Sequence, residues 1–199
     1  MPRAGLNTDR VVAEAMELAD EVGLDKLTLA ALAIRLGVRQ PSLYKHVAGL
    51  DALHRLISMR AKAEAADALG QAAMGRARDD ALVATAWAWR AWARDHPGRY
   101  QASQRGAAAS DAEHEAVARQ TIGVLVAVMD GYGLHGDDAI DAIRAYRAAL
   151  HGFVTLEANG GFAFRDSLDR SFDWLVRSLV LALSSWSKVS GPGRAAPAR

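Results

Sequence analysis

The sequence predicts an all-α fold, with a three-helix helix-turn-helix head followed by a helical body. Ala, Leu, Glu and Arg recur at spacings of three and four residues along most of the 199 residues, which is the period of an amphipathic helix. Runs of β-branched residues alternating with polar ones, which indicate strands, are absent. Glycines, prolines and N-cap residues separate the periodic stretches, so several helices are expected.

Three short helices are expected first. Thr8 can cap a helix that stops at Gly23, and Thr28 can cap a second helix that closes at Gly37. Pro41 fits the first turn of a third helix, because a residue in that position needs no N–H donor.

The rest of the chain predicts longer helices. They are expected at about 51–70, from 79 or 80 to 96, from 111 to 131 or 133, at about 137–157 and from about 169 to 186. The stretch 99–110 is poorly defined, and 188–199 is expected to be a disordered tail. The predicted domains are therefore a head at 6–49 and a body at 50–187.

Composition excludes several classes of protein. The chain has no cysteine, which rules out disulfide frameworks, thiol nucleophiles and cysteine-ligated metals. Its 24 Lys and Arg against 23 Asp and Glu leave a net charge of +1, so any nucleic-acid contact must come from a local patch. No run is long enough to cross a bilayer, and the first residues lack the apolar core of a signal peptide. We expect a cytoplasmic protein without a membrane partner.

Positive charge gathers where the second and third predicted helices meet. Residues 26–60 hold six Lys and Arg against Asp51 alone, an excess of five, whereas 1–25 hold two Arg against six acids. Gly37 permits a tight turn, and Leu43 and Val47 form the inward stripe of the third helix. This spacing predicts a helix-turn-helix, in which the second helix of the pair enters the major groove of DNA.

The outward residues of the third helix suit that task. Arg39 and Gln40 can contact the edges of guanine and adenine. Tyr44, Lys45 and His46 suit phosphates. The alternative is a solvated helical hairpin with ordinary surface charges.

Residues 8–57 resemble the DNA-binding domain of the TetR family of bacterial transcription regulators. The resemblance rests on GLDKLTLAALAIRLGVRQPSLYKHVAGLDAL at 23–53 and is nearest to the tetracycline repressor subgroup. It implies a homodimer, a ligand-binding body and repression relieved by a small effector. By position it implies DNA contacts from Thr28, Arg39, Gln40, Pro41, Ser42, Tyr44, Lys45 and His46. Many members have a phosphate-binding Lys before the next helix, whereas residues 48–51 here contain none.

The C-terminal half carries a second resemblance, to a TetR-type C-terminal domain named for a Trp-His-Gly motif. It rests on HPGRY at 96–100 and HGFVTLEANGGF at 151–162, with Leu150 in place of the Trp. It implies dimer contact through the last two helices, which we expect to form a four-helix arrangement. The candidate interface residues are Phe153, Phe172, Leu175, Leu179 and Leu183.

The body is expected to hold an effector pocket lined by aromatic residues, which also pack ordinary cores. The candidates are Trp87, Trp89, Trp92, Tyr100, Tyr146 and His151. Core packing is the alternative for the aromatic residues, and a structural histidine is the alternative for His151.

No catalytic, metal or cofactor site is expected. Asp137, Asp138 and Asp141 suit the first turn of a helix, where acids complement the helix dipole. No nucleophile elbow, zinc motif, phosphate loop or dinucleotide turn is present in the sequence. The sequence therefore predicts an operator-binding repressor that is not an enzyme and that an unknown small molecule releases. The alternatives are an activator of the same fold, or a small-molecule-binding protein with a vestigial head.

Overall fold

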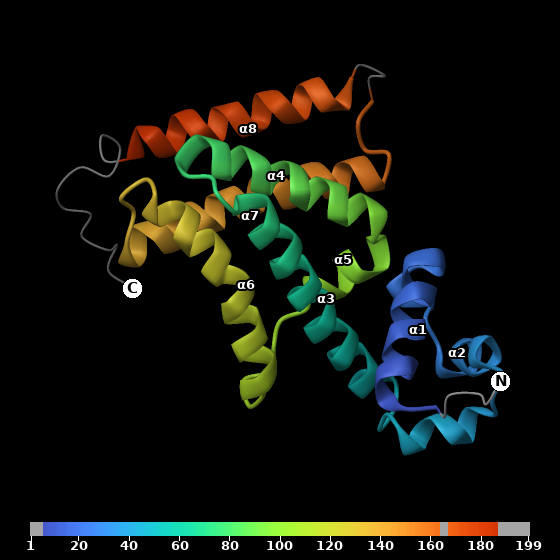
Figure 1. The fold of residues 1–199 in the computed structure, drawn as a ribbon. Helices are drawn as coiled ribbons and strands as arrows, with labels where there is room; N and C mark the ends of the chain where they lie inside the picture. Colours follow the sequence, from blue (N-terminus) through green and yellow to red (C-terminus); the bar gives the residue numbers. More distant parts are fainter. Residues whose placement is uncertain (1–5, 164–166, 187–199) are drawn as a thin grey trace, which may run out of the picture. The chain divides into compact units, whose positions relative to one another are not determined.

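The computed structural model describes residues 6–163 and 167–186, and the predicted tail at 188–199 lies outside them. The regular structure of these residues is entirely helical, with no strand, and Figure 1 traces the helices in chain order. The α-helices are α1 (Thr8–Val22), α2 (Leu29–Leu36), α3 (Leu50–Ala73), α4 (Arg78–Asp95), α5 (Pro97–Ser103), α6 (Ala112–Asp130), α7 (Gly136–Ala158) and α8 (Leu168–Ser184). Two short 3₁₀-helices, η1 (Leu24–Lys26) and η2 (Gln40–Lys45), flank α2. The all-α prediction is confirmed.

The chain packs as two units. Unit 1 comprises residues 1–68 and 91–123, and unit 2 comprises residues 69–90 and 124–199. Helices α3, α4 and α6 each contribute a segment to both units. The domain boundary at residue 50 stays a prediction. No helix of the described chain combines the length and apolarity that a membrane span requires.

Unit 1 has one apolar core, built by α1, α2, η2 and the first turns of α3. Met16, Leu32, Leu43, Leu53 and Ile57 are essentially inaccessible to solvent and belong to the same cluster. Because Leu43 of η2 and Leu53 of α3 share this core, the start of α3 is packed directly behind the turn that η2 forms.

Local capping explains the ends of the first two helices, with one difference from the prediction. Asn7, and not Thr8, caps α1, accepting a hydrogen bond from the backbone N–H of Arg10 at 2.8 Å. The Thr8 hydroxyl instead donates to the carbonyl of His46 at 3.2 Å. Thr28 caps α2 as predicted, accepting from the N–H of Ala31 at 3.1 Å.

Helix α5 lies in a region where the sequence predicts a stop followed by irregular chain. Pro97 opens it, and Gly98 is buried against the backbone of α1, where a Cβ would lie 2.1 Å from the carbonyl oxygen of Ala19. The backbone N–H of Arg99 donates to Asp20 of α1 at 2.8 Å. A helix of only seven residues is too short to be stable alone, so α5 depends on this contact with α1. Its length also explains why the sequence shows no strong periodic pattern there.

Unit 2 is held by polar groups as well as apolar ones. The buried hydroxyl of Tyr146 in α7 donates to the carbonyl of Leu82 at 3.0 Å and lies 2.9 Å from the hydroxyl of Thr85. Burial raises the pKa of Tyr146, so it stays neutral. These bonds fix α7 against α4.

Arg90 of α4 binds carboxylates near the end of α7 and the start of α8. Its guanidinium binds both oxygens of Glu157 in α7 at 2.8 and 2.6 Å, and Asp169 in α8 at 2.8 Å. It also lies 4.9–5.4 Å from the ring centroids of Trp87, Phe153 and Phe172. Hydrogen bonding to Glu157 raises the pKa of Arg90, so this side chain remains a cation.

Candidate nucleic-acid interface

The turn between α2 and α3 is built by a buried side and an exposed side. Gly37, with a left-handed φ of 67°, ends α2, and Pro41 stands in the first turn of η2. Leu43 is 0% exposed and Val47 4%. The third predicted helix is therefore a 3₁₀-helix of six residues, Gln40–Lys45, fixed to the core from behind.

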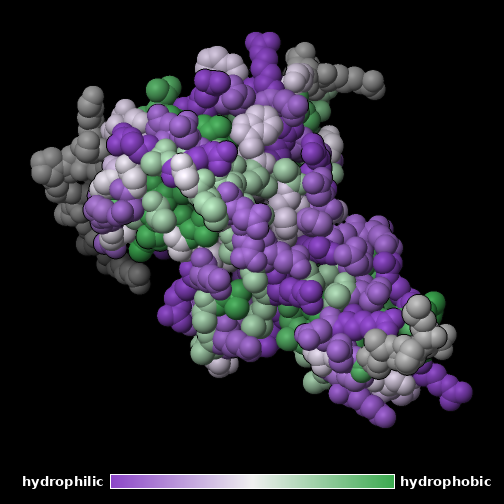
Figure 2. Space-filling view, in the orientation of Figure 1, coloured by the Kyte–Doolittle hydropathy of each residue, from purple (hydrophilic) through white to green (hydrophobic). Residues whose placement is uncertain are grey.

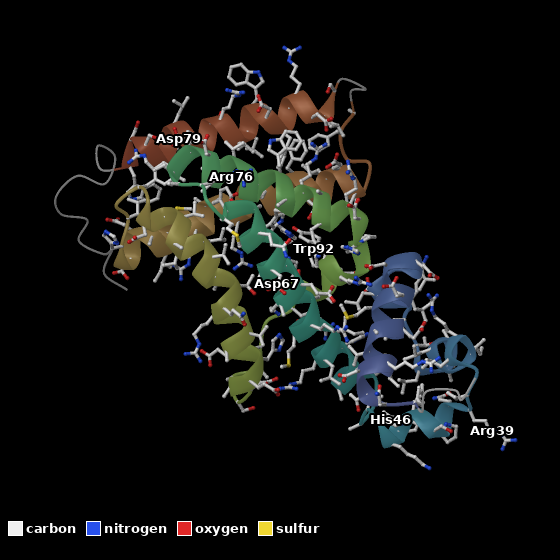
Figure 3. The ribbon with its side chains drawn as sticks, in the orientation of Figure 1. Arg39, His46, Asp67, Arg76, Asp79 and Trp92 are labelled. Atoms are coloured by element: carbon white, nitrogen blue, oxygen red, sulfur yellow. The ribbon has the colours of Figure 1, made fainter. Side chains whose placement is uncertain are left out.

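The predicted DNA-contacting residues lie on the other side of this turn. Arg39, Gln40, Pro41, Tyr44 and Lys45 are exposed, and so is Thr28 at the start of α2. Ser42 and His46 are half-buried. Figure 3 shows Arg39 projecting away from the helices, and in Figure 2 the surface of this region at the lower right is mostly hydrophilic. The structure thus brings donors and acceptors onto one accessible surface.

Only part of the charge in 26–60 is available to a ligand. Arg35 binds two carboxylates of α1, at 3.1 and 2.7 Å, and hydrogen bonding to Glu21 and then Glu14 raises its pKa. Arg55 binds two carboxylates near the start of α6, and Arg60 binds one on its own helix at 3.5 Å. The other three cations have no carboxylate within 4 Å among the described residues; they are Lys26, Arg39 and Lys45. Half of the six cations of this stretch are therefore already paired with carboxylates of the protein.

The candidate effector residues do not form one cluster in either unit. In unit 1 the ring of Trp92 lies 6.3 Å from that of Tyr100. In unit 2 Trp87 packs edge-on against Phe172 at 5.0 Å, Tyr146 is buried, Trp89 is half-buried and His151 is exposed. The effector pocket stays a prediction.

One polar cluster was not singled out in the sequence. Ser58 and Lys62, one turn apart on α3, lie against His114 of α6, and all three side chains are buried. The spacing of four between two polar residues on an otherwise apolar helix face was the available signal. Within the described ranges, no three His, Asp or Glu side chains are grouped as metal ligands would be.

Comparison with known proteins assigns the chain to a family. Residues 82–179 match the tetracyclin repressor-like C-terminal domain. Over 183 residues the chain is 38% identical to the HTH-type transcriptional regulator Rv0681 of Mycobacterium tuberculosis, covering 92% of this chain and 82% of that protein. It is 36% identical over 93 residues to the class D tetracycline repressor of Escherichia coli, covering 47% of this chain and 37% of the repressor.

A solved structure supports the fold. A variant of TetR from Acinetobacter baumannii AYE, in complex with minocycline, superposes with a TM-score of 0.70 at 23% identity, covering 92% of this chain and 98% of that one. Together with the helix-turn-helix in unit 1, these matches establish that the chain is a DNA-binding transcriptional regulator and belongs to the TetR family.

Proposed function

We propose that this regulator binds a pseudo-palindromic operator as a homodimer and represses transcription until a small molecule releases it. The observation that carries the DNA contact is the two-sided turn of η2: Leu43 is buried behind an exposed row of Arg39, Gln40, Tyr44 and Lys45. In a dimer, two such turns enter successive major grooves roughly 34–36 Å apart. Arg39 and Gln40 contact base edges, and Lys45 contacts a phosphate.

The homodimer rests on apolar side chains that the protomer leaves exposed on its last two helices. Ile140 and Leu156 of α7 are 44% and 48% exposed, and Trp174 and Leu181 of α8 are 66% and 69% exposed. A second copy would bury them, as exposed apolar patches mark interaction surfaces. The expected interface residues Phe153, Phe172 and Leu183 are buried inside the protomer, and Leu175 and Leu179 are half-buried.

Release by an effector follows from linkage. A ligand that binds better to a conformation whose two heads fit the operator poorly shifts the population toward that conformation. The minocycline complex of the related TetR supports a small-molecule ligand for the body. Helix α3 begins directly behind η2, so it is the element through which we propose that the shift reaches the head.

Selection of duplexes from a random DNA pool tests the DNA contact and supplies the operator. With that operator, Gln40→Ala should relax base preference at one position in each half-site at a cost of ~1–3 kcal/mol. Lys45→Ala should weaken binding to all sequences and lower the slope of log affinity against log salt by about one for each protomer.

Arg35→Gln is the matched control, because it also removes a cation next to the turn but one that α1 already binds. It should leave the salt slope unchanged. A wild-type protein that binds no duplex at low salt would contradict the proposal and favour the vestigial head. The position of the operator relative to its promoter distinguishes repression from activation.

A further inference from the structure

The buried cluster of Ser58, Lys62 and His114 lies within unit 1, where α3 faces the start of α6. Ser58 is 0% exposed, Lys62 8% and His114 3%. The ammonium of Lys62 donates to Ser58 Oγ at 2.8 Å and to the carbonyl of Arg105 at 2.5 Å, and it lies 2.7 Å from His114 Nε2. One side chain thus holds α3 to α6 and to the segment that precedes α6.

The geometry limits the number of protons that this cluster can hold. Nε2 of His114 can accept an N–H of the Lys62 ammonium only if it carries a lone pair, so His114 is neutral in this arrangement. The other nitrogen, Nδ1, lies 3.8 Å from Asp111 and carries the proton. If the proton moves from Lys62 to His114, the total is the same. In either arrangement, Lys62 and His114 share a single positive charge.

Charged groups from each neighbouring element surround His114. Asp111 precedes α6 and is bound by Arg55 of α3, which holds the pKa of Asp111 at about 2, and Arg55 also binds Glu113. Asp111 therefore stays ionised, but Arg55 already compensates its charge. Burial lowers the pKa of His114, and the charge of Lys62 lowers it further. The charge of Asp111 raises this pKa, whereas that of Arg55 lowers it.

We propose that Lys62 and His114 form an acid-sensitive latch between α3 and the start of α6. A second proton would place two cations 2.7 Å apart in a buried site, with Nε2 turned from acceptor to donor. The contact breaks, Lys62 leaves the carbonyl of Arg105, and the segment 104–114 separates from α3. Because Leu53 and Ile57 of α3 share the core that supports η2, the latch tunes the packing behind the DNA-binding turn.

Two measurements on the full chain test the latch. In NMR titration, His114 of the wild type should titrate below the value of about 6.5 that is usual for histidine. Lys62→Met, which removes the competing charge, should move this midpoint upward. Amide exchange of 104–114, corrected for its intrinsic pH dependence, should accelerate between pH 7.5 and 5.5 in the wild type. It should accelerate much less in His114→Gln, which can accept a hydrogen bond but not a proton.

Urea unfolding gives a third readout with a defined sign. The unfolded chain takes a proton on His114 near pH 6.5 and the folded chain only at lower pH, so the unfolded state binds more protons below about 6.5. The contribution of His114 to the free energy of unfolding should be complete above that pH and should be lost as the solution is acidified. Burial also lowers the pKa of His54 on α3, so His54 contributes to the same dependence of stability on pH. The difference between wild type and His114→Gln therefore isolates the latch.

His135→Gln is the control. His135 is exposed and lies 3.0 Å from the exposed Asp130, and because surface pairs of this kind contribute little to stability, this variant should follow the wild-type curve closely. A wild-type His114 that titrates at or above 6.5 would overturn the proposal, and so would an equal response of exchange to acid in wild type and His114→Gln. All three measurements are made without DNA, so their failure leaves the proposed operator binding untouched.

Discussion

The contact between α1 and α5 depends on the absence of one side chain. Gly98 occupies the second position of α5, and a Cβ built there would lie 2.1 Å from Ala19 O, 2.2 Å from Ala19 C and 2.6 Å from Asp20 N. All three atoms belong to the backbone of α1, so no neighbouring side chain can rotate away. Gly98→Ala must therefore separate the two helices.

The cost of that separation follows from the geometry. An ordinary contact between carbon and a carbonyl oxygen is roughly 3.3 Å, so α5 must move by about 1.2 Å. Overpacking against backbone costs about 3 kcal/mol at the upper end of the usual range. The same movement stretches the bond from the Arg99 N–H to the Asp20 carboxylate, which adds roughly 1–2 kcal/mol. Ala is the better helix former by about 0.5–1 kcal/mol, which offsets part of this cost, so we expect Gly98→Ala to lower the free energy of unfolding by about 3–4.5 kcal/mol.

Urea unfolding followed by circular dichroism measures this change. Gly123→Ala is the matched control, because a Cβ at this helical glycine of α6 meets nothing within 4 Å. That variant should be more stable than the wild type by about 0.5–1 kcal/mol, since Ala is the better helix former. If Gly98→Ala unfolded at the wild-type urea concentration, with an unchanged m-value, the close approach of α5 to α1 would be refuted.

Three further substitutions probe single contacts. Arg90→Lys should lower the unfolding free energy by about 2–3 kcal/mol, since an ammonium can neither form the paired bonds to Glu157 nor stack on three rings; urea unfolding at two protein concentrations reports it. Tyr146→Phe should cost ~1–2 kcal/mol in the same assay, because the buried partners of its hydroxyl lose a bond, and an unchanged midpoint would contradict this. Thr28→Ala should cost about 1 kcal/mol through loss of the α2 cap, whereas Thr28→Ser should retain it.

The elements that the sequence predicts well are those whose signals are local. Thr28 and Gly37 bracket α2, and the cap and the left-handed glycine act within one turn of the helix that they bound. The exposed side of η2 could be predicted for the same reason, because two buried apolar positions four residues apart leave the others outward. The exact form of that element, a 3₁₀-helix of six residues, was not predictable, because so short a stretch has no periodic pattern that distinguishes it from a turn of α-helix.

Features that depend on distant residues escaped prediction. Helix α5 begins within a His-Pro-Gly sequence that is typical of a helix stop. Its first turn is stabilised by Asp20 of α1, 79 residues earlier, which accepts the N–H of Arg99. The contact between Lys62 and His114 joins residues 52 positions apart, so no local pattern in the sequence indicates it. Neither contact produces a periodic pattern in the sequence.

The role of each cation in the head depends on its position more than on the number of cations there. Arg35 and its carboxylates on α1 lie 14 and 21 residues apart, so they tie α2 to α1 inside the head and contribute little net charge outside it. Lys26, Arg39 and Lys45 have no carboxylate partner among the described residues, and Arg39 and Lys45 belong to the proposed DNA-contacting surface. We therefore expect these two to displace counterions from DNA. Salt should therefore weaken operator binding through these two side chains far more than it weakens the head, whose stability comes mainly from the apolar core around Leu32 and Leu43.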